Sequence, residues 1–65
     1  MIEWRIFRNA NCIDGYISNI IVYELTKVLG GWGIFVKPSD TLGPILDTLE
    51  EAKQWCEIHH AVGAT

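Results

Sequence analysis

Residues 47–57 read Asp47-Thr48-Leu49-Glu50-Glu51-Ala52-Lys53-Gln54-Trp55-Cys56-Glu57, and this stretch decides the fold because it predicts a capped amphipathic helix. Thr48 and Glu51 have the spacing of a capping box, which satisfies backbone amides left unpaired at the start of a helix. Apolar side chains then recur at helical spacing and predict one buried face. That face consists of Leu49, Ala52, Trp55, Cys56 and His59.

The residues before this helix have the patterns of β-strands. Between Ile2 and Phe7, apolar and charged residues alternate with a period of two, which predicts a first strand. Residues 9–15 are rich in Asn, Asp and Gly and predict a loop. Residues 17–28 are rich in β-branched and aromatic side chains, which favours a strand. Their apolar positions also fit helical spacing, so a helix over the same residues stays open.

A glycine pair separates this segment from the next apolar run. Gly30-Gly31 precedes Trp32–Lys37, and two strands joined by such a connection predict an antiparallel hairpin. Pro38 should end the strand, because proline cannot donate a backbone hydrogen bond. Residues 39–44 predict a loop, and Ile45-Leu46 is a candidate short edge strand before the helix.

These elements predict the fold class α+β. We expect residues 1–65 to form one small domain, with a three- or four-stranded antiparallel sheet and the C-terminal helix packed on one face. A chain of this length buries only about 60% of its unfolded surface, so we expect marginal stability. The helix residues Leu49, Ala52, Trp55 and Cys56 should pack against Ile2, Trp4, Ile6, Ile21, Tyr23, Ile34 and Val36.

The sequence predicts no enzyme, cofactor or metal site. Cys56 and His60 have the i, i+4 spacing of ligands on one helix face, but adjacent histidines on a helix diverge by about 100°, and a fourth ligand lacks an obvious place. Cys56 lies late in the helix, far from the terminus that would lower its pKa, and Cys12 has no local base. The glycines at 30–33 lack the spacing of a phosphate-binding loop. We expect both cysteines to be free thiols.

Charge divides the chain into two unequal parts. Residues 1–37 hold four Lys or Arg against three Asp or Glu, a net charge of +1, whereas residues 38–65 hold five acids against Lys53 alone, a net charge of −4. Glu50 and Glu57 are seven residues apart, so a helix places them on one face about 10 Å apart. We interpret the acidic residues as candidates for binding a basic partner surface. They are Asp40, Asp47, Glu50, Glu51 and Glu57.

Two other hypotheses follow from the same residues. A small DNA-binding or regulatory module would use a basic sheet face with aromatic rings for stacking. Its residues would be Arg5, Arg8, Lys27 and Lys37 with Trp4, Phe7, Tyr23 and Trp32. A net charge of +1 is weak for binding phosphates, so we expect no direct nucleic-acid binding. A structural protein would instead use surplus apolar surface to oligomerise, and we expect a monomer or a weak homodimer.

The termini and apolar runs predict a cytoplasmic protein. The N-terminal residues 1–5 contain Glu3 and Arg5 where a signal peptide would need a basic patch followed by an apolar run. The apolar run at residues 20–23 is too short to span a bilayer. We therefore expect no membrane partner.

The short, acidic chain has two marked segments, Trp32-Gly33-Ile34-Phe35-Val36 and Thr48-Leu49-Glu50-Glu51-Ala52-Lys53-Gln54-Trp55. In this format it resembles the small proteins of phages and mobile elements. Among these it is most similar to the anti-CRISPR proteins, in particular to inhibitors of type I-C systems. The resemblance covers the whole chain in format and includes no diagnostic motif.

The resemblance implies non-catalytic inhibition in the bacterial host cytoplasm. An acidic surface would dock on the basic DNA-recognition surface of a CRISPR effector subunit and keep target DNA out. Because no motif aligns, charge and spacing alone select the residues that would carry this role, namely Asp40, Asp47, Glu50, Glu51 and Glu57.

Overall fold

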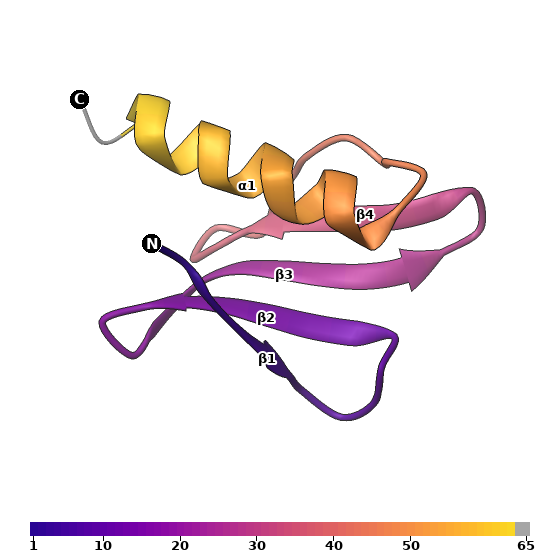
Figure 1. Cartoon of the computed structure of the whole chain (residues 1–65), viewed down its shortest axis with the longest axis horizontal. Helices are drawn as coiled ribbons and strands as arrows, with labels where there is room; N and C mark the ends of the chain where they lie inside the picture. The colour runs from indigo at the N-terminus through magenta and orange to yellow at the C-terminus, as the bar shows by residue number, and fades with distance from the viewer. Residues whose placement is uncertain (64–65) are drawn as a thin grey trace.

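The computed structural model describes residues 1–63 and has an antiparallel sheet with one helix packed on one of its faces (Figure 1). Five strands follow one another in sequence order, each antiparallel to the next, as a meander. The strands are β1 (Glu3–Ile6), β2 (Cys12–Ile17), β3 (Ile20–Val28), β4 (Gly31–Val36) and β5 (Thr41–Leu42), and the helix is α1 (Leu49–Gly63). The predicted α+β class is confirmed, with one strand more than expected.

The predicted loop at residues 9–15 is wrong in its second half, because β2 begins at Cys12. The chain reverses earlier, where the Cys12 amide donates to the Asn9 carbonyl and the Asn9 side chain accepts from the Asn11 amide. Gly15 continues the strand because it lies beneath Ile2 and Trp4, where a Cβ would come within 2.8 Å of both side chains. The glycine that suggested a turn is required instead by close packing.

The strand prediction for residues 17–28 is confirmed for Ile20–Val28, and the alternative helix is wrong. The segment is not one element, however, because Ile17 ends β2 and a two-residue turn follows. Ser18 and Asn19 have φ angles of 52° and 66°. Positive φ at both central residues is what a type I′ hairpin turn requires, and Asn adopts it at little cost.

The predicted hairpin at the glycine pair is confirmed, since β3 and β4 pair from Val28 with Gly31 to Tyr23 with Val36. The strand ends before Pro38, as expected. The loop predicted for residues 39–44 contains the short strand β5, which pairs with the end of β4. At Ile45-Leu46 the structure has a single bridge between Leu46 and Trp32 and no strand.

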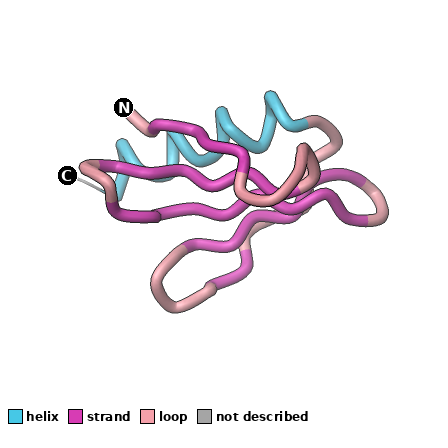
Figure 2. The backbone as a smooth tube through the Cα atoms, turned by 90° about the horizontal axis from the view of Figure 1, so that it is seen from below, coloured by secondary structure: helices cyan, strands magenta, loops and turns pink. Residues whose placement is uncertain are grey.

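The helix begins after Thr48, as predicted, but one half of the capping box differs, because Glu51 accepts from the Thr48 hydroxyl and not from the Thr48 backbone amide. The Glu51 amide donates to Thr48 Oγ1 over 3.1 Å, and the Thr48 hydroxyl donates to Glu51 Oε1 over 3.1 Å. α1 lies along the sheet, on one side of it (Figure 2), and contacts β3 and β4. The buried face of the helix therefore packs against the β3–β4 hairpin.

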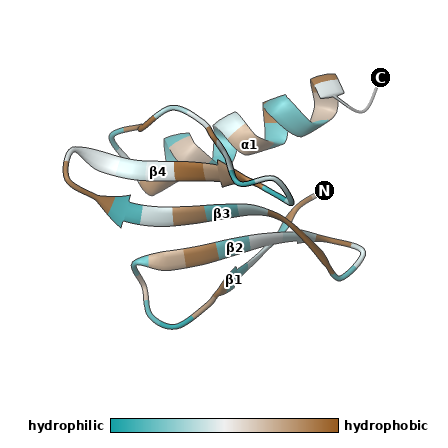
Figure 3. Ribbon diagram, turned by 180° about the vertical axis from the view of Figure 1, so that it is seen from behind, coloured by the Kyte–Doolittle hydropathy of each residue, from teal (hydrophilic) through white to brown (hydrophobic). Residues whose placement is uncertain are grey.

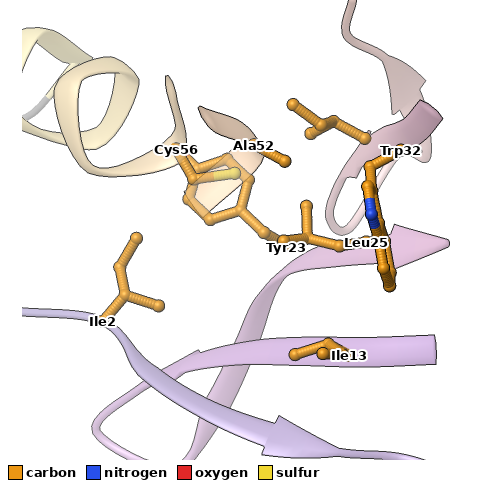
Figure 4. Packing of buried hydrophobic residues seen from close by; sticks show 8 residues of the cluster. Ile2, Ile13, Tyr23, Leu25, Trp32, Ala52 and Cys56 are labelled. Carbon is orange, nitrogen blue, oxygen red and sulfur yellow. The ribbon is translucent and has the colours of Figure 1, made fainter. Parts of the chain in front are cut away.

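The core lies between this helix face and the sheet (Figure 4). Ala52 and Cys56 have no exposed surface, and Leu49 and Trp55 pack at the border, as predicted. The buried residues are Ile2, Ile13, Tyr23, Leu25, Trp32, Ile34, Ala52 and Cys56. The prediction for Ile6 is wrong, because its side chain is 66% exposed at the end of the edge strand, beyond the reach of the helix. Ile21 is also outside the core cluster, next to the bulge where the β2–β3 register shifts.

The two adjacent glycines should differ sharply in their tolerance of a side chain. A Cβ at Gly31, where φ is 144°, would lie 2.0 Å from the Leu46 carbonyl oxygen, whereas a Cβ at Gly30, where φ is 95°, would meet nothing within 4 Å. We expect Gly31→Ala to lower the free energy of unfolding by more than about 3 kcal/mol and Gly30→Ala by about 1–2 kcal/mol. Urea unfolding followed by tryptophan fluorescence measures both, and equal losses would contradict the packing at Gly31.

Candidate interaction surface

Four of the five acidic candidates lie on or next to α1. Glu50 and Glu57 lie on one flank of the helix, because seven residues are close to two helical turns, and Glu50 is exposed whereas Glu57 is half-buried beside Cys56. Asp47 precedes the cap, and Glu51 lies in the first turn with Glu50, where the helix dipole favours negative charge. We call Asp47, Glu50, Glu51 and Glu57 the acidic helix surface.

Asp40 does not belong to this surface. It lies in the turn after β4, with a φ of 58°, and its Oδ1 is 2.5 Å from Lys37 Nζ. Asp47 lies at the other end of β4, close to Gly31. Since a strand rises about 3.3 Å per residue, the length of β4 separates the two carboxylates by more than about 15 Å. The structure therefore places Asp40 apart from the other four and pairs it with a cation.

The acidic helix surface is not paired with cations of the described residues. Between residues 1 and 63, no Lys or Arg forms an ion pair with any of its four carboxylates. Lys53, the cation of the acidic part of the chain, lies with its Nζ 6.0 Å from the centre of the Trp4 ring. Glu51 is partly engaged by the Thr48 hydroxyl, Asp47 and Glu50 are exposed, and Glu57 is half-buried.

The alternative basic and aromatic residues include two cations beside rings, Arg8 at Phe7 and Lys27 at Trp32, but two of the four rings are buried. Tyr23 and Trp32 are 3% and 9% exposed, because they face the helix. Arg5 donates to Glu3 and to the Asn19 side chain, and its guanidinium lies 4.3 Å from the centre of the Tyr16 ring. Lys37 bridges Glu24 and Asp40 on the far part of the sheet. The rings and the cations therefore do not form one exposed stacking surface.

One polar contact could not be predicted from the sequence. The Tyr23 hydroxyl lies 2.6 Å from His59 Nδ1, and the His59 ring stacks on Trp55 with centroids 4.7 Å apart and an angle of 14° between the planes. His59 was predicted on the buried helix face, and it lies instead at the exposed border of that face. Tyr23 precedes it by 36 residues, so no local spacing could have linked the two.

The cysteines are free thiols, as predicted. Cys56 is fully buried, and burial, assisted by the charge of Glu57, raises the pKa of its thiol to about 12. Such a thiol is almost entirely protonated near pH 7 and is a poor nucleophile. Within residues 1–63, no three His, Cys, Asp or Glu side chains are grouped so that they could hold a metal ion.

Asp14 is a second group that sequence analysis did not find. It is 4% exposed, and its Oδ1 has no hydrogen-bond partner. Its cross-strand neighbours are Arg5 and Glu24. Burial raises the pKa of Asp14, the charge of Glu24 raises it further, and the charge of Lys37 opposes both.

Comparison with known proteins assigns no family. No protein-family model matches the chain, and neither a curated protein nor a solved structure matches it. Over the range 1–63, no helix has the length and apolar character needed to cross a membrane. The class that the structure defines is a small α+β domain with an acidic helix surface.

The Asp14 carboxyl should make stability depend on pH. Because its folded pKa is raised, the folded state binds this proton more tightly, and the resulting stabilisation is lost as pH rises above about 4 through the raised pKa. We therefore expect Asp14→Asn to increase the free energy of unfolding, relative to the wild type, more at pH 7 than at pH 3. Urea titrations at both pH values measure this difference. An equal effect at both would show that Asp14 does not titrate in this range.

The two thiols should differ in reactivity. Cys12 is partly exposed and Cys56 is buried with a raised pKa, so we expect one thiol per chain to react rapidly with an aromatic disulfide reagent at pH 8. Cys12→Ser should remove the rapid phase, leaving Cys56 to react only when urea unfolds the chain. A rapid phase that persists in Cys12→Ser would contradict the burial of Cys56.

Proposed function

We propose that this protein is a non-catalytic inhibitory binding protein of phage or mobile-element origin, of the anti-CRISPR type. The acidic helix surface docks on a basic DNA-recognition surface of a CRISPR effector in the bacterial cytoplasm and blocks binding of target DNA. The observation that carries the proposal is the position of Glu50 and Glu57 on one flank of α1, the first exposed and the second half-buried, with no ion pair to any Lys or Arg between residues 1 and 63.

Physical chemistry supports this pairing of surfaces. Carboxylates accept charge-assisted hydrogen bonds from Lys and Arg, as phosphate oxygens do. Glu50 and Glu57 lie about 10 Å apart on a rigid helix, so two basic groups can be engaged without ordering a flexible chain. Complementary charge also speeds encounter, and both the rate and the affinity fall as salt screens the charges.

The chemistry of the remaining side chains supports binding rather than catalysis. The buried thiol of Cys56 is held protonated, and the His59 Nδ1 is engaged by the Tyr23 hydroxyl. A nucleophile needs an adjacent free base or a lowered pKa. Neither condition is met at Cys56.

Self-association is a second candidate function. Several large apolar side chains are more than half exposed, and they lie on different parts of the molecule. They are Met1, Ile6, Phe7, Ile20, Leu29, Leu42, Ile45, Ile58 and Val62. Sedimentation equilibrium over a range of protein concentrations tests this candidate, and a constant monomer mass rejects it.

Charge reversal tests the inhibitory function. We expect the Glu50→Lys/Glu57→Lys variant to need at least tenfold more protein, about 1.4 kcal/mol of binding free energy, for half-inhibition of a purified type I-C effector binding its target duplex. A mobility-shift assay with labelled duplex measures the inhibition, and capture of the effector by tagged protein measures the contact. Inhibition by the wild type should weaken as salt rises.

The matched control is Glu3→Lys, which reverses one exposed charge at the edge strand, away from α1. It should inhibit as well as the wild type. The proposed function is rejected if the wild type does not inhibit, or if the double variant inhibits as well as Glu3→Lys.

A further inference from the structure

One edge of the sheet is open. β1 is the first strand in the order β1-β2-β3-β4-β5, so it has a strand on one side only (Figure 1). α1 contacts β3 and β4, and it leaves the outer side of β1 uncovered. At the opposite edge, β5 has only two residues, and Leu46 bridges Trp32 near the start of β4. Within residues 1–63, β1 therefore offers the longer unpaired edge to another chain.

The backbone of β1 has hydrogen-bonding groups on this open side. The Phe7 amide donates to the first residue of β2 over 2.9 Å. Alternate residues of an antiparallel strand direct their amide and carbonyl groups to the same side, so Glu3 and Arg5 also face β2. Trp4 and Ile6 direct theirs outward. A row of such groups is a template for pairing with another strand.

The charges of this edge match a second, antiparallel copy of the same strand. Glu3 and Arg5 are exposed and lie on one face, on either side of Trp4. A two-fold axis at Glu3 would bring two Glu3 side chains together, and an axis at Arg5 would bring two Arg5 side chains together. An axis at Trp4 instead places each Glu3 opposite the Arg5 of the other copy. Opposite charges in facing positions stabilise a sheet and like charges destabilise it, so the charges select the axis at Trp4.

Exposed apolar side chains lie on both sides of these charges. Met1, Ile6 and Phe7 are 106%, 66% and 56% exposed. With the axis at Trp4, residue 1 of one copy faces residue 7 of the other, so Met1 and Phe7 cover each other. Hydrophobic and hydrophilic residues both occur along β1 (Figure 3). A two-fold interface must be complementary to itself, and this strand meets that condition in both charge and apolar surface.

Arg5 has donors for a second carboxylate. Its Nε donates to Glu3 over 2.9 Å, and one terminal nitrogen donates to the Asn19 side chain over 3.1 Å. A guanidinium has five N–H donors, so these two bonds leave others for another chain. The side chains of Arg5 and Glu3 are 42% and 65% exposed. Another chain can therefore reach both groups.

We propose that two copies of this protein associate through β1, antiparallel, about a two-fold axis at Trp4. The Trp4 amide of each copy donates to the Trp4 carbonyl of the other, each Glu3 pairs with the Arg5 of the other copy, and the two sheets join into one. Because the contact is a short strand, the association is weak, with a dissociation constant on the order of 100 μM. This gives self-association a defined surface, and it does not depend on the inhibitory function.

Charge variants at positions 3 and 5 test the proposal. Sedimentation equilibrium between about 10 μM and about 1 mM should show the mass of the wild type rising from 7.3 kDa toward twice that value. Glu3→Arg or Arg5→Glu alone should weaken association at least tenfold, because like charges then face each other. An equimolar mixture of the two single variants should associate as well as the wild type, because opposite charges face each other in the mixed dimer. Mixing cannot repair a defect that arises within one chain.

The backbone contact has a readout of its own. Hydrogen exchange followed by NMR should show that protection of the Trp4 amide rises with protein concentration in the wild type and stays low in Glu3→Arg. The matched control is Asp47→Arg, which reverses an exposed charge close to Gly31, across the sheet from β1. It should associate like the wild type. Circular dichroism checks that all variants keep the fold.

The outcomes distinguish this inference from the proposed function. A constant monomer mass of the wild type up to about 1 mM overturns the β1 contact. Single variants that associate like the wild type, or a mixture that stays monomeric, overturn it as well. A dimer in which the Trp4 amide gains no protection uses another surface and also overturns the proposal. None of these results changes the test of inhibition, which compares the wild type with Glu50→Lys/Glu57→Lys.

Discussion

The structure depends on a pair of backbone hydrogen bonds between Trp32 and Leu46. The Trp32 amide donates to the Leu46 carbonyl over 2.7 Å, and the Leu46 amide donates to the Trp32 carbonyl over 3.0 Å. They hold the chain against the start of β4 just before it turns into α1, and they require Gly31, whose missing Cβ leaves room for the Leu46 carbonyl. The constraint therefore fixes where the helix begins above the sheet.

From that starting point the helix can bury its apolar face. Ala52 and Cys56 are fully buried over β3 and β4, and the sheet side of the core includes Leu25 and Ile34, which are also almost completely inaccessible. A domain of 65 residues has few such positions, so each buried side chain contributes a large share of a small net stability. Glu50 is then exposed and Glu57 half-buried, because the neighbouring face of the same helix is occupied by the core.

Only part of the candidate interaction surface could be predicted from the sequence. The acidic part could be predicted from Glu50 and Glu57 alone, since seven residues on a helix return to the same face. The contact of Tyr23 with His59 at the border of the helix could not, because it joins β3 to α1 across 36 positions. The prediction that Asp40 belongs to the acidic surface failed for a different reason. Asp40 has the expected charge, but the β4–β5 turn places it beside Lys37 and away from the helix.

The sequence by itself determined the elements whose signals are local: the capping box at Thr48 and Glu51, the period-two strand at the N-terminus and the hairpin at Gly30-Gly31. Only the tertiary structure decided the others. Gly15 lies in a strand because Ile2 and Trp4 pack over it, and Asp14 is buried because of strands that it meets in space. Local signals arise from backbone propensity within a few residues, whereas packing between distant segments sets burial, pairing and the final position of each charge.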